Sequence, residues 1–231
     1  MRTILIGDIH GCYDEFISLL GVTKFNKKKD RLVILGDFID KGPKSFDVLK
    51  YLSELKDEMN DNLIVLEGNH EYHFKYRGHN IFKKMILICL GRSKTKQSFK
   101  DNGHNFNYYD TFLYTKLRNY YEDTNFRACH ASIKKDNIKE NSKYTLVANR
   151  FSTFNSKYKG KLTITGHLGL KEPMYYPGDG SHIELDYNEE KILPKKGIIC
   201  IDTNCHAGNK LTAMIIDNNK YILKYVDGVK K

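Results

Sequence analysis

The nine residues TILIGDIHG at positions 3–11 decide the fold, because a short apolar run ends abruptly in glycine, carboxylate and imidazole. The same arrangement returns at residues 32–35, which precede Gly36-Asp37, and at residues 63–66, which lead into Gly68-Asn69-His70. Apolar runs of this length between turn residues predict short buried strands. The sequence therefore predicts three strands, each with a polar ending.

Helical patterns separate these three runs. Phe16, Leu19 and Leu20 recur at helical spacing after the first run. A second helical pattern lies behind Pro43 and contains Val48, Leu49, Leu52 and Leu55. Strands that alternate with helices predict an α/β protein with a largely parallel sheet, whose ligands bind outside the carboxyl ends of the strands. We therefore expect the three polar endings to meet in space.

The middle of the chain, from about residue 71 to 123, has a mostly helical pattern. Two apolar faces are expected there, one made of Phe82, Met85, Ile86 and Leu90 and the other of Phe112, Leu113, Leu117 and Tyr121. This segment is predicted to be a helical insert with no chemistry of its own.

Further candidate strands lie in the second half, at residues 126–129, 162–165, 198–201, 211–216 and 222–226. The first two end on polar residues, at His130-Ala131 and Gly166-His167. The last two are separated only by the turn at Asn218-Asn219. This spacing predicts an antiparallel section or a second sheet.

Composition favours one folded domain over residues 1–231, since no linker-like tract interrupts the chain. Five cysteines without a CxxC pair indicate a reducing compartment, and no stretch approaches the ~20 apolar residues of a membrane span. The sequence thus predicts a cytoplasmic protein without a membrane partner. A net charge of +10 is compatible with nucleic acid, but the lysines are dispersed, which favours a solvated surface.

Five strand ends supply oxygen and imidazole ligands without a thiolate. Such a set favours two divalent transition-metal ions, with manganese preferred and iron or zinc as alternatives. The candidate ligands are Asp8, His10, Asp37, Asp40, Asn69, His70, His130 and His167.

The ordered motifs resemble those of a known family. They are Gly7-Asp8-Ile9-His10-Gly11, Gly36-Asp37-Phe38-Ile39-Asp40-Lys41-Gly42-Pro43, Gly68-Asn69-His70-Glu71, His130-Ala131 and Gly166-His167. Their order resembles that of the calcineurin-like metallophosphoesterases and, more narrowly, of the bacterial and phage members of the phosphoprotein phosphatase group. The resemblance extends from about residue 1 to 217. It implies a β-sandwich of mixed sheets flanked by helices.

The resemblance also implies a division of roles. Asp8, His10 and Asp37 would hold one metal, and Asp37 would bridge to a second held by Asn69, His130 and His167. A water activated by the two metals would then attack phosphorus. His70 would act as general acid, with Asp40 binding its other ring nitrogen.

Relatives usually hold the substrate phosphoryl group with arginine side chains at three positions, which we call the phosphate clamp. Here they read Lys41, Glu67 and Arg150. Lys41 keeps the charge but loses the bidentate fork, and Glu67 reverses the charge unless it points away or pairs with a lysine. Together with Asn69, the cations Lys41 and Arg150 are expected to bind the substrate phosphate.

Several functions stay open at this point. The resemblance favours a serine/threonine protein phosphatase acting on a phosphorylated protein or a small phosphoester. Glu67 leaves room for a diadenosine tetraphosphate hydrolase. A nucleic-acid phosphoesterase and a binding protein without turnover are weaker alternatives. Substrate choice is expected to lie in loops at residues 76–110 and 170–196, and His206 is expected to be a surface or structural histidine.

Overall fold

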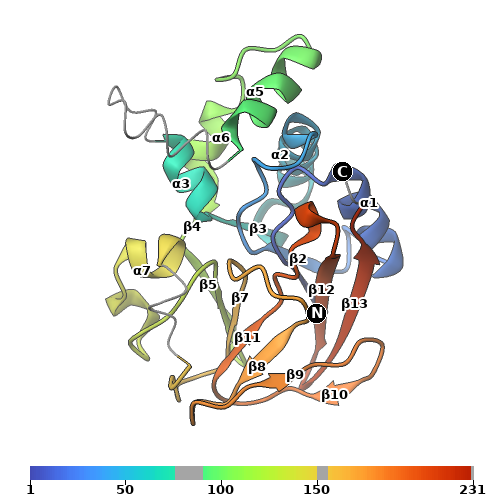
Figure 1. The fold of residues 1–231 in the computed structure, drawn as a ribbon. Helices are drawn as coiled ribbons and strands as arrows, with labels where there is room; N and C mark the ends of the chain where they lie inside the picture. The colour runs from blue at the N-terminus through green and yellow to red at the C-terminus, as the bar shows by residue number, and fades with distance from the viewer. Residues whose placement is uncertain (76–90, 150–155, 230–231) are drawn as a thin grey trace.

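The computed structural model describes residues 1–75, 91–149 and 156–229. Two mixed β-sheets pack face to face, and helices cover the outer face of each sheet, as Figure 1 shows. The layers are therefore helix, sheet, sheet and helix. This arrangement confirms the predicted α/β sandwich of mixed sheets.

The first sheet has seven strands and contains all three strands predicted from the opening motifs. Four neighbouring strands are parallel: β1 (Thr3–Ile6), β2 (Arg31–Ile34), β3 (Leu63–Leu66) and β4 (Leu117–Arg118). Three antiparallel strands extend it on the other side of β1: β12 (Lys210–Asp217), β13 (Lys220–Asp227) and β10 (Lys191–Ile192). Strand β1 thus lies inside the sheet, between β2 and β12.

The second sheet has six strands and comes from the second half of the chain. Its order is β5 (Tyr120–Glu122), β6 (Arg127–Cys129), β7 (Thr163–Thr165), β11 (Ile198–Cys200), β8 (Met174–Tyr176) and β9 (Ile183–Glu184). Its three central strands, β6, β7 and β11, are parallel. The prediction of a second sheet is confirmed.

Alternating side chains of the strands supply two different cores. In β1, Ile4 and Ile6 pack against the helices, whereas Leu5 belongs to the core between the two sheets. Successive side chains of a strand point to opposite faces, so a run that is apolar throughout is buried on both sides. Ile164 and Ile199 of the second sheet complete the core between the sheets.

The predicted helices lie on the outer face of the first sheet. Helix α1 (Tyr13–Val22) buries Phe16, Leu19 and Leu20 there. Helix α2 (Ser45–Met59) buries the predicted residues Val48, Leu49, Leu52 and Leu55. The opposite side of the molecule carries helix α7 (Lys143–Ala148), whose first turn is capped by the Ser142 hydroxyl. Short 3₁₀ turns occupy η1 (Asn60–Asn62), η2 (Ile138–Glu140) and η4 (Cys205–Ala207).

The middle segment differs in part from its helical prediction. It contains α3 (Asn69–Lys75), α5 (Arg92–Asp101) and α6 (Asp110–Thr115), but residues 117–122 form strands β4 and β5. The predicted helical face is therefore wrong at Leu117 and Tyr121, which pair with neighbouring strands, whereas Phe112 and Leu113 are buried in α6. The other predicted face, at Phe82, Met85, Ile86 and Leu90, lies outside the described residues.

The segment at residues 170–196 is also more regular than predicted. Strands β8, β9 and β10 lie within it. In the second sheet, β8 lies between β11 and β9 and pairs with both. Among the described residues, no helix has the length and apolar character needed to cross a membrane. The cytoplasmic location stays a prediction.

Candidate metal centre

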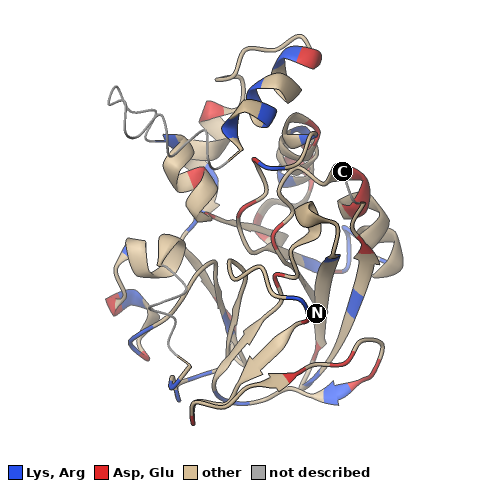
Figure 2. Cartoon of the chain, viewed as in Figure 1, with Lys and Arg blue, Asp and Glu red and all other residues tan. Residues whose placement is uncertain are grey.

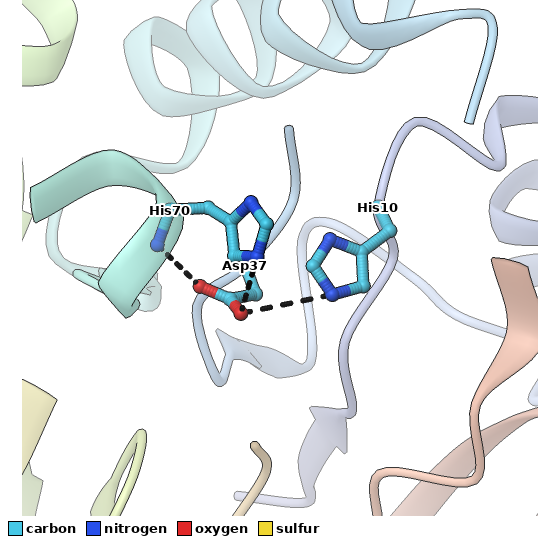
Figure 3. A group of neighbouring side chains, drawn as sticks. All are labelled: His10, Asp37 and His70. Carbon is cyan, nitrogen blue, oxygen red and sulfur yellow. Dashed lines mark hydrogen bonds and ion pairs between the residues drawn. The ribbon is translucent and has the colours of Figure 1, made fainter. Parts of the chain in front are cut away.

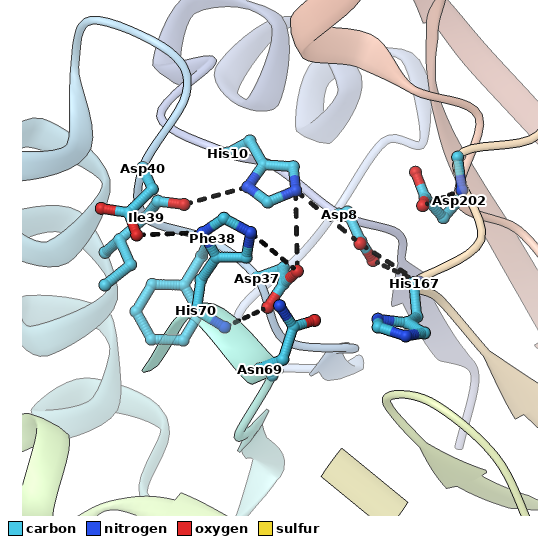
Figure 4. Close-up of polar contacts among 12 residues, drawn as sticks. Asp8, His10, Asp37, Phe38, Ile39, Asp40, Asn69, His70, His167 and Asp202 are labelled. Carbon is cyan, nitrogen blue, oxygen red and sulfur yellow. Dashed lines mark hydrogen bonds and ion pairs between the residues drawn. The ribbon is translucent and has the colours of Figure 1, made fainter. Parts of the chain in front are cut away.

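Polar residues that follow strands of both sheets converge at one edge of the sandwich. Loops after β1, β2, β6, β7 and β11 contribute to this edge, together with the start of α3. Figure 4 shows their side chains grouped around Asp37. The residues lining the resulting cleft of about 280 Å³ are Asp8, His10, Asp37, Lys41, Asn69, His70, His167, Leu168, Gly169, Asp202, Asn204 and His206. Predicted site residues from distant parts of the chain thus meet in space.

Asp37 lies at the centre of this group and faces three imidazoles. Its Oδ2 atom lies 3.6 Å from Nε2 of His10 and 3.8 Å from Nε2 of His70, as Figure 3 shows. Its Oδ1 atom lies 3.4 Å from Nε2 of His130. The Oδ1 atom also accepts a hydrogen bond from the His70 backbone N–H at 2.9 Å. Imidazoles thus lie close to both oxygens of this carboxylate. Such a carboxylate could be shared by two cations.

Several potential metal-ligand atoms lie close to the His130 ring. Its Nδ1 lies 2.9 Å from the Leu35 carbonyl, to which it donates, so Nε2 of the neutral ring is an acceptor. That Nε2 atom lies 3.2 Å from both Asn69 Oδ1 and His167 Nδ1. With the Asp37 oxygen, several acceptors therefore face one another at one point. A divalent cation fits such a donor set, because it would supply the positive charge that these atoms lack.

His10 and Asp8 have equivalent constraints on the other side of Asp37. The Nδ1 atom of His10 lies 3.0 Å from the Ile39 carbonyl, which directs Nε2 toward Asp37 and Asp8. Both oxygens of Asp8 accept from the His167 backbone N–H, at 3.2 and 3.1 Å. Outer hydrogen bonds of this kind orient metal ligands. The residues present therefore fit two cations, and the assignment of each ligand to a cation stays a prediction.

Burial of like charges shifts the titration of these groups. Burial and the neighbouring Asp202 raise the pKa of Asp8 well above its usual value. Burial lowers the pKa of His130, but Asp37 and Asp8 outweigh it and raise that pKa to about 10. Burial also raises the pKa of Asp37, yet His130 and His70 hold it well below its usual value. Without a cation, the cluster retains a proton; a bound metal would take the place of that positive charge.

The backbone at the cleft is strained. Asp37 has a φ of 46° and His10 a φ of 47°, and Asp40, Lys41 and His167 are left-handed as well. Residues other than glycine adopt such angles at a cost of roughly 1–3 kcal/mol each. Four of these residues line the cleft and Asp40 is buried, which indicates that the surrounding fold fixes them in otherwise unfavourable conformations.

Glycines allow close approach of the backbone to the predicted ligands. A Cβ atom on Gly166 would lie 2.1 Å from Oδ1 of Asp8, and one on Gly68 would lie 2.1 Å from Oδ1 of Asp37. No side chain fits at either position without displacing a carboxylate. These glycines therefore shape the site.

Glu71 is a buried residue that sequence reasoning assigned no role. Its carboxylate accepts hydrogen bonds from the backbone N–H groups of Asp37, Phe38, Ile39 and Gly68, at 2.9 to 3.2 Å. Burial and Asp37 raise the pKa of Glu71 to about 8. The side chain thus joins the loop after β2 to the turn before α3. Its place directly after Asn69-His70 was the available signal in the sequence.

Glu67 does not line the cleft. Its buried carboxylate forms ion pairs with Lys75 at 2.9 Å and with Lys143 at 2.7 Å. Pairing with a lysine was one of the outcomes expected for this residue, and two lysines take part. Among the described residues that line the cleft, Lys41 is the only lysine, and there is no arginine. The predicted clamp residue Arg150 lies outside the described residues.

The loop after β11 supplies Asp202 and Asn204, for which the sequence predicted no role, and His206, which was expected to be a surface or structural histidine. Asp202, Asn204 and His206 all line the cleft. The His206 ring lies edge-on to His10 with centroids 5.0 Å apart. Burial and Lys41 lower the pKa of His206 to about 4. The sequence predicts a surface or structural role for His206, and the structure places its half-buried side chain in the lining of the cleft.

Charged residues are spread over the whole fold, as Figure 2 shows. Lysine and arginine occur on helices, strands and loops of both halves, with Asp and Glu between them. This dispersal agrees with the prediction of a solvated basic surface.

The two packed sheets, with carboxylates and imidazoles at their strand ends, define a metal-dependent phosphoester hydrolase. A model of the calcineurin-like phosphoesterase family matches residues 1–201, and the chain belongs to that family. This membership confirms the resemblance seen in the ordered motifs.

Two sequence relatives and one solved structure are similar to this chain. The chain is 42% identical over 113 residues to a symmetrical bis(5'-nucleosyl)-tetraphosphatase of Buchnera aphidicola, covering 49% of this chain and 33% of the relative. It is 47% identical over 100 residues to the protein of the same name from Klebsiella pneumoniae, and this match covers 43% of this chain and 31% of the relative. The matches thus span about a third of these relatives. A Saccharomyces cerevisiae protein serine/threonine phosphatase shares the fold, with a TM-score of 0.66 and 14% identity over 100% of this chain and 81% of that one.

These comparisons bear on the competing functions. Phosphoester hydrolysis is supported by the family match. The names of the two sequence relatives correspond to the predicted alternative, a dinucleoside polyphosphate hydrolase, and not to the serine/threonine protein phosphatase expected first. The phosphatase neighbour is similar in fold only.

Proposed function

We propose that the protein hydrolyses a phosphoanhydride bond of a dinucleoside tetraphosphate, the substrate class in the names of its sequence relatives. Identities of 42% and 47% to symmetrical bis(5'-nucleosyl)-tetraphosphatases support this substrate. The observation that carries the proposed chemistry is the position of Asp37, whose two oxygens face His10, His70 and His130 within 3.8 Å.

Two divalent cations fit around Asp37. Asp8, His10 and Asp37 would hold the first, and Asp37, Asn69, His130 and His167 the second. Manganese is our proposed metal, since mixed carboxylate and imidazole ligands without thiolate suit it. When bound, the cations would supply Lewis acidity that activates water and neutralises phosphate oxygens.

The protein's own residues would handle the proton and the substrate. His70 donates the proton to the leaving phosphate oxygen from Nε2, while its Nδ1 is held 2.9 Å from Oδ2 of Asp40. Lys41 and the Asn69 amide lie in the cleft, where they can bind phosphate oxygens. A tetraphosphate offers several such oxygens along one chain. Arg150 stays a proposed phosphate ligand on the basis of its sequence position.

The expected phosphate-binding positions depart from those of a phosphoprotein phosphatase. A phosphoprotein phosphatase needs a strong clamp on one dianionic phosphate, and arginine forks provide it. Here position 41 is lysine, and position 67 is a glutamate engaged by Lys75 and Lys143. Both departures weaken a clamp centred on a single phosphate.

Product analysis tests the proposal directly. Purified protein with Mn²⁺ and diadenosine tetraphosphate should yield two ADP molecules per substrate, separable by anion-exchange chromatography. The His70→Ala and Asp37→Ala variants should lose at least roughly 100-fold in kcat, while the exposed His182→Ala serves as control. Release of AMP and ATP would contradict symmetrical cleavage. Faster turnover of a phosphoserine peptide would instead favour a protein phosphatase.

A further inference from the structure

Helix α5 of the middle segment reaches the Asp40–His70 pair, contrary to our expectation that the insert has no chemistry of its own. Nη2 of Arg92 lies 3.0 Å from Oδ2 of Asp40 and donates to the His70 carbonyl at 3.0 Å. The Thr95 hydroxyl donates to Oδ1 of Asp40 at 2.6 Å. Both oxygens of the Asp40 carboxylate are therefore bound from α5.

Arg92 is held firmly in this position. Its side chain is 5% exposed, and its guanidinium carbon lies 4.5 Å above the centroid of the Phe74 ring on α3. A buried guanidinium stacked on an aromatic ring has little rotational freedom. Arg92 thus fixes the Asp40 side chain and the His70 main chain with one rigid group.

Thr95 closes a small ring of hydrogen bonds with Asp40. Its hydroxyl oxygen accepts from the Asp40 backbone N–H at 3.0 Å, while the hydroxyl proton goes to the Asp40 carboxylate. Ser45 accepts from the same N–H at 3.1 Å. Asp40 is fully buried and has a left-handed φ of 68°. The ring therefore holds a strained residue and sets the direction of its side chain.

We propose that Arg92 and Thr95 are positioning residues that orient His70 for proton delivery. The inference rests on the proposed function only in taking His70 as the general acid. A carboxylate whose oxygens are fixed by Arg92 and Thr95 accepts the His70 Nδ1–H in one orientation. The Nε2 atom then points into the cleft, 3.8 Å from Oδ2 of Asp37. Errors in such alignment reduce rates sharply, since catalysis depends on the placement of the reacting groups.

Leaving-group dependence tests this role, because only a poor leaving group needs the proton. Phenyl phosphate requires protonation of its leaving oxygen, whereas 4-nitrophenyl phosphate departs readily without it. Thr95→Val and Arg92→Met should lower kcat on phenyl phosphate by at least roughly 10-fold, with less than roughly 3-fold loss on the nitrophenyl ester and unchanged KM. Thr95→Ser retains the hydroxyl and should restore the rate. Equal losses on both esters would overturn the proposal. The control is Lys100→Met, on the exposed end of α5.

A second measurement does not depend on turnover. In imidazole-labelled protein, the Nδ1 proton of His70 should exchange with water at least roughly 10-fold faster in Thr95→Val and Arg92→Met than in the wild type, as followed by NMR. Unchanged exchange in both variants would overturn the proposal whatever their activity. Failure of the wild type to cleave diadenosine tetraphosphate would instead reject the proposed substrate, since neither the aryl esters nor the exchange measurement involves it.

Discussion

The Glu67 carboxylate lies 2.7 Å from Nζ of Lys143, and this ion pair joins the end of β3 to the first turn of α7. Glu67 is 2% exposed at its side chain, whereas Lys143 is 43% exposed. The acidic charge that would oppose a phosphate is thereby compensated within the protein. The pair thus joins a strand of the first sheet to a helix that packs beside the second sheet.

Replacing Lys143 with methionine should therefore affect stability more than catalysis. Lys75 still compensates Glu67, so we expect the free energy of unfolding to fall by only about 1 kcal/mol, with kcat within roughly twofold of the wild type. Urea unfolding and steady-state kinetics measure the two quantities. Lys139→Met, at an exposed lysine nearby in the chain, is the control. A large loss of kcat without a loss of stability would show that Lys143 serves the substrate.

Substitution of Gly166 by alanine should damage metal binding. The new methyl group would lie 2.1 Å from Oδ1 of Asp8 and would displace that carboxylate. We expect Mn²⁺ affinity, measured by isothermal titration calorimetry, to fall at least roughly 10-fold.

Gly21 provides the matched control, because a Cβ atom there meets open space within α1. Gly21→Ala should keep the metal affinity and raise the free energy of unfolding by about 0.5–1 kcal/mol. Normal Mn²⁺ binding by Gly166→Ala would refute the assignment of Asp8 as a ligand.

Removal of divalent cations should lower the thermal stability. The buried carboxylates of Asp8, Asp37 and Asp202 would then lose compensating charge. Mn²⁺ at about a hundredfold excess over its Kd should raise Tm by about 5–10 °C relative to EDTA-treated protein. Differential scanning calorimetry measures the shift. Asp37→Asn should show little dependence on Mn²⁺, and an equal shift in that variant would place the bound metal elsewhere.

Asp30 should make a pH-dependent contribution to stability. It accepts hydrogen bonds from Nε and Nη2 of Arg2, at 3.0 and 2.6 Å, and from the Asn26 backbone. Burial raises the pKa of Asp30, but the bonds from Arg2 and Asn26 outweigh it and lower that pKa below its usual value. A depressed pKa means that the carboxylate stabilises the fold above its unfolded pKa of about 4, and that this stabilisation is lost as pH falls through the folded value.

The Asp30→Asn variant should accordingly be less stable by about 1–2 kcal/mol at pH 7, and the difference should shrink as the pH falls below about 4. Chemical unfolding at several pH values measures this. Asp57→Asn, at an exposed position of α2, should show no such dependence. A constant difference at all pH values would assign the effect to packing.

Local patterns were sufficient for the strands that carry the metal motifs. In β1, β2 and β3, a largely apolar run leads into a glycine and a polar residue, and all three strands formed within one residue of the predicted positions. Strands β4 and β5 were missed because each has two or three residues, too few to show a period of two. Their pairing partners, β3 and β6, are separate segments of the chain that the local pattern does not include.

The same limit applies to the site. The carboxylate, amide and imidazole residues at the strand ends were readable from the sequence, because each lies directly after an apolar run. Arg92, Thr95 and His206 were not, since their roles depend on which loop α5 and η4 contact in the folded chain. Nothing in the local sequence around Arg92 distinguishes it from a solvated arginine of a helix.

The position of β1 between β2 and β12 has a consequence for synthesis on the ribosome. Thr3 pairs with Ile216, and Ile6 pairs with Ala213, so the two partners are about two hundred residues apart. At about 5–20 residues per second, roughly 10–40 s separate the emergence of the two strands. During that interval one edge of β1 has no native partner. Asp8 and His10, which follow this strand, have already been synthesised by then. The edge of β1 is thus open to incorrect strand pairing until the hairpin of β12 and β13 emerges.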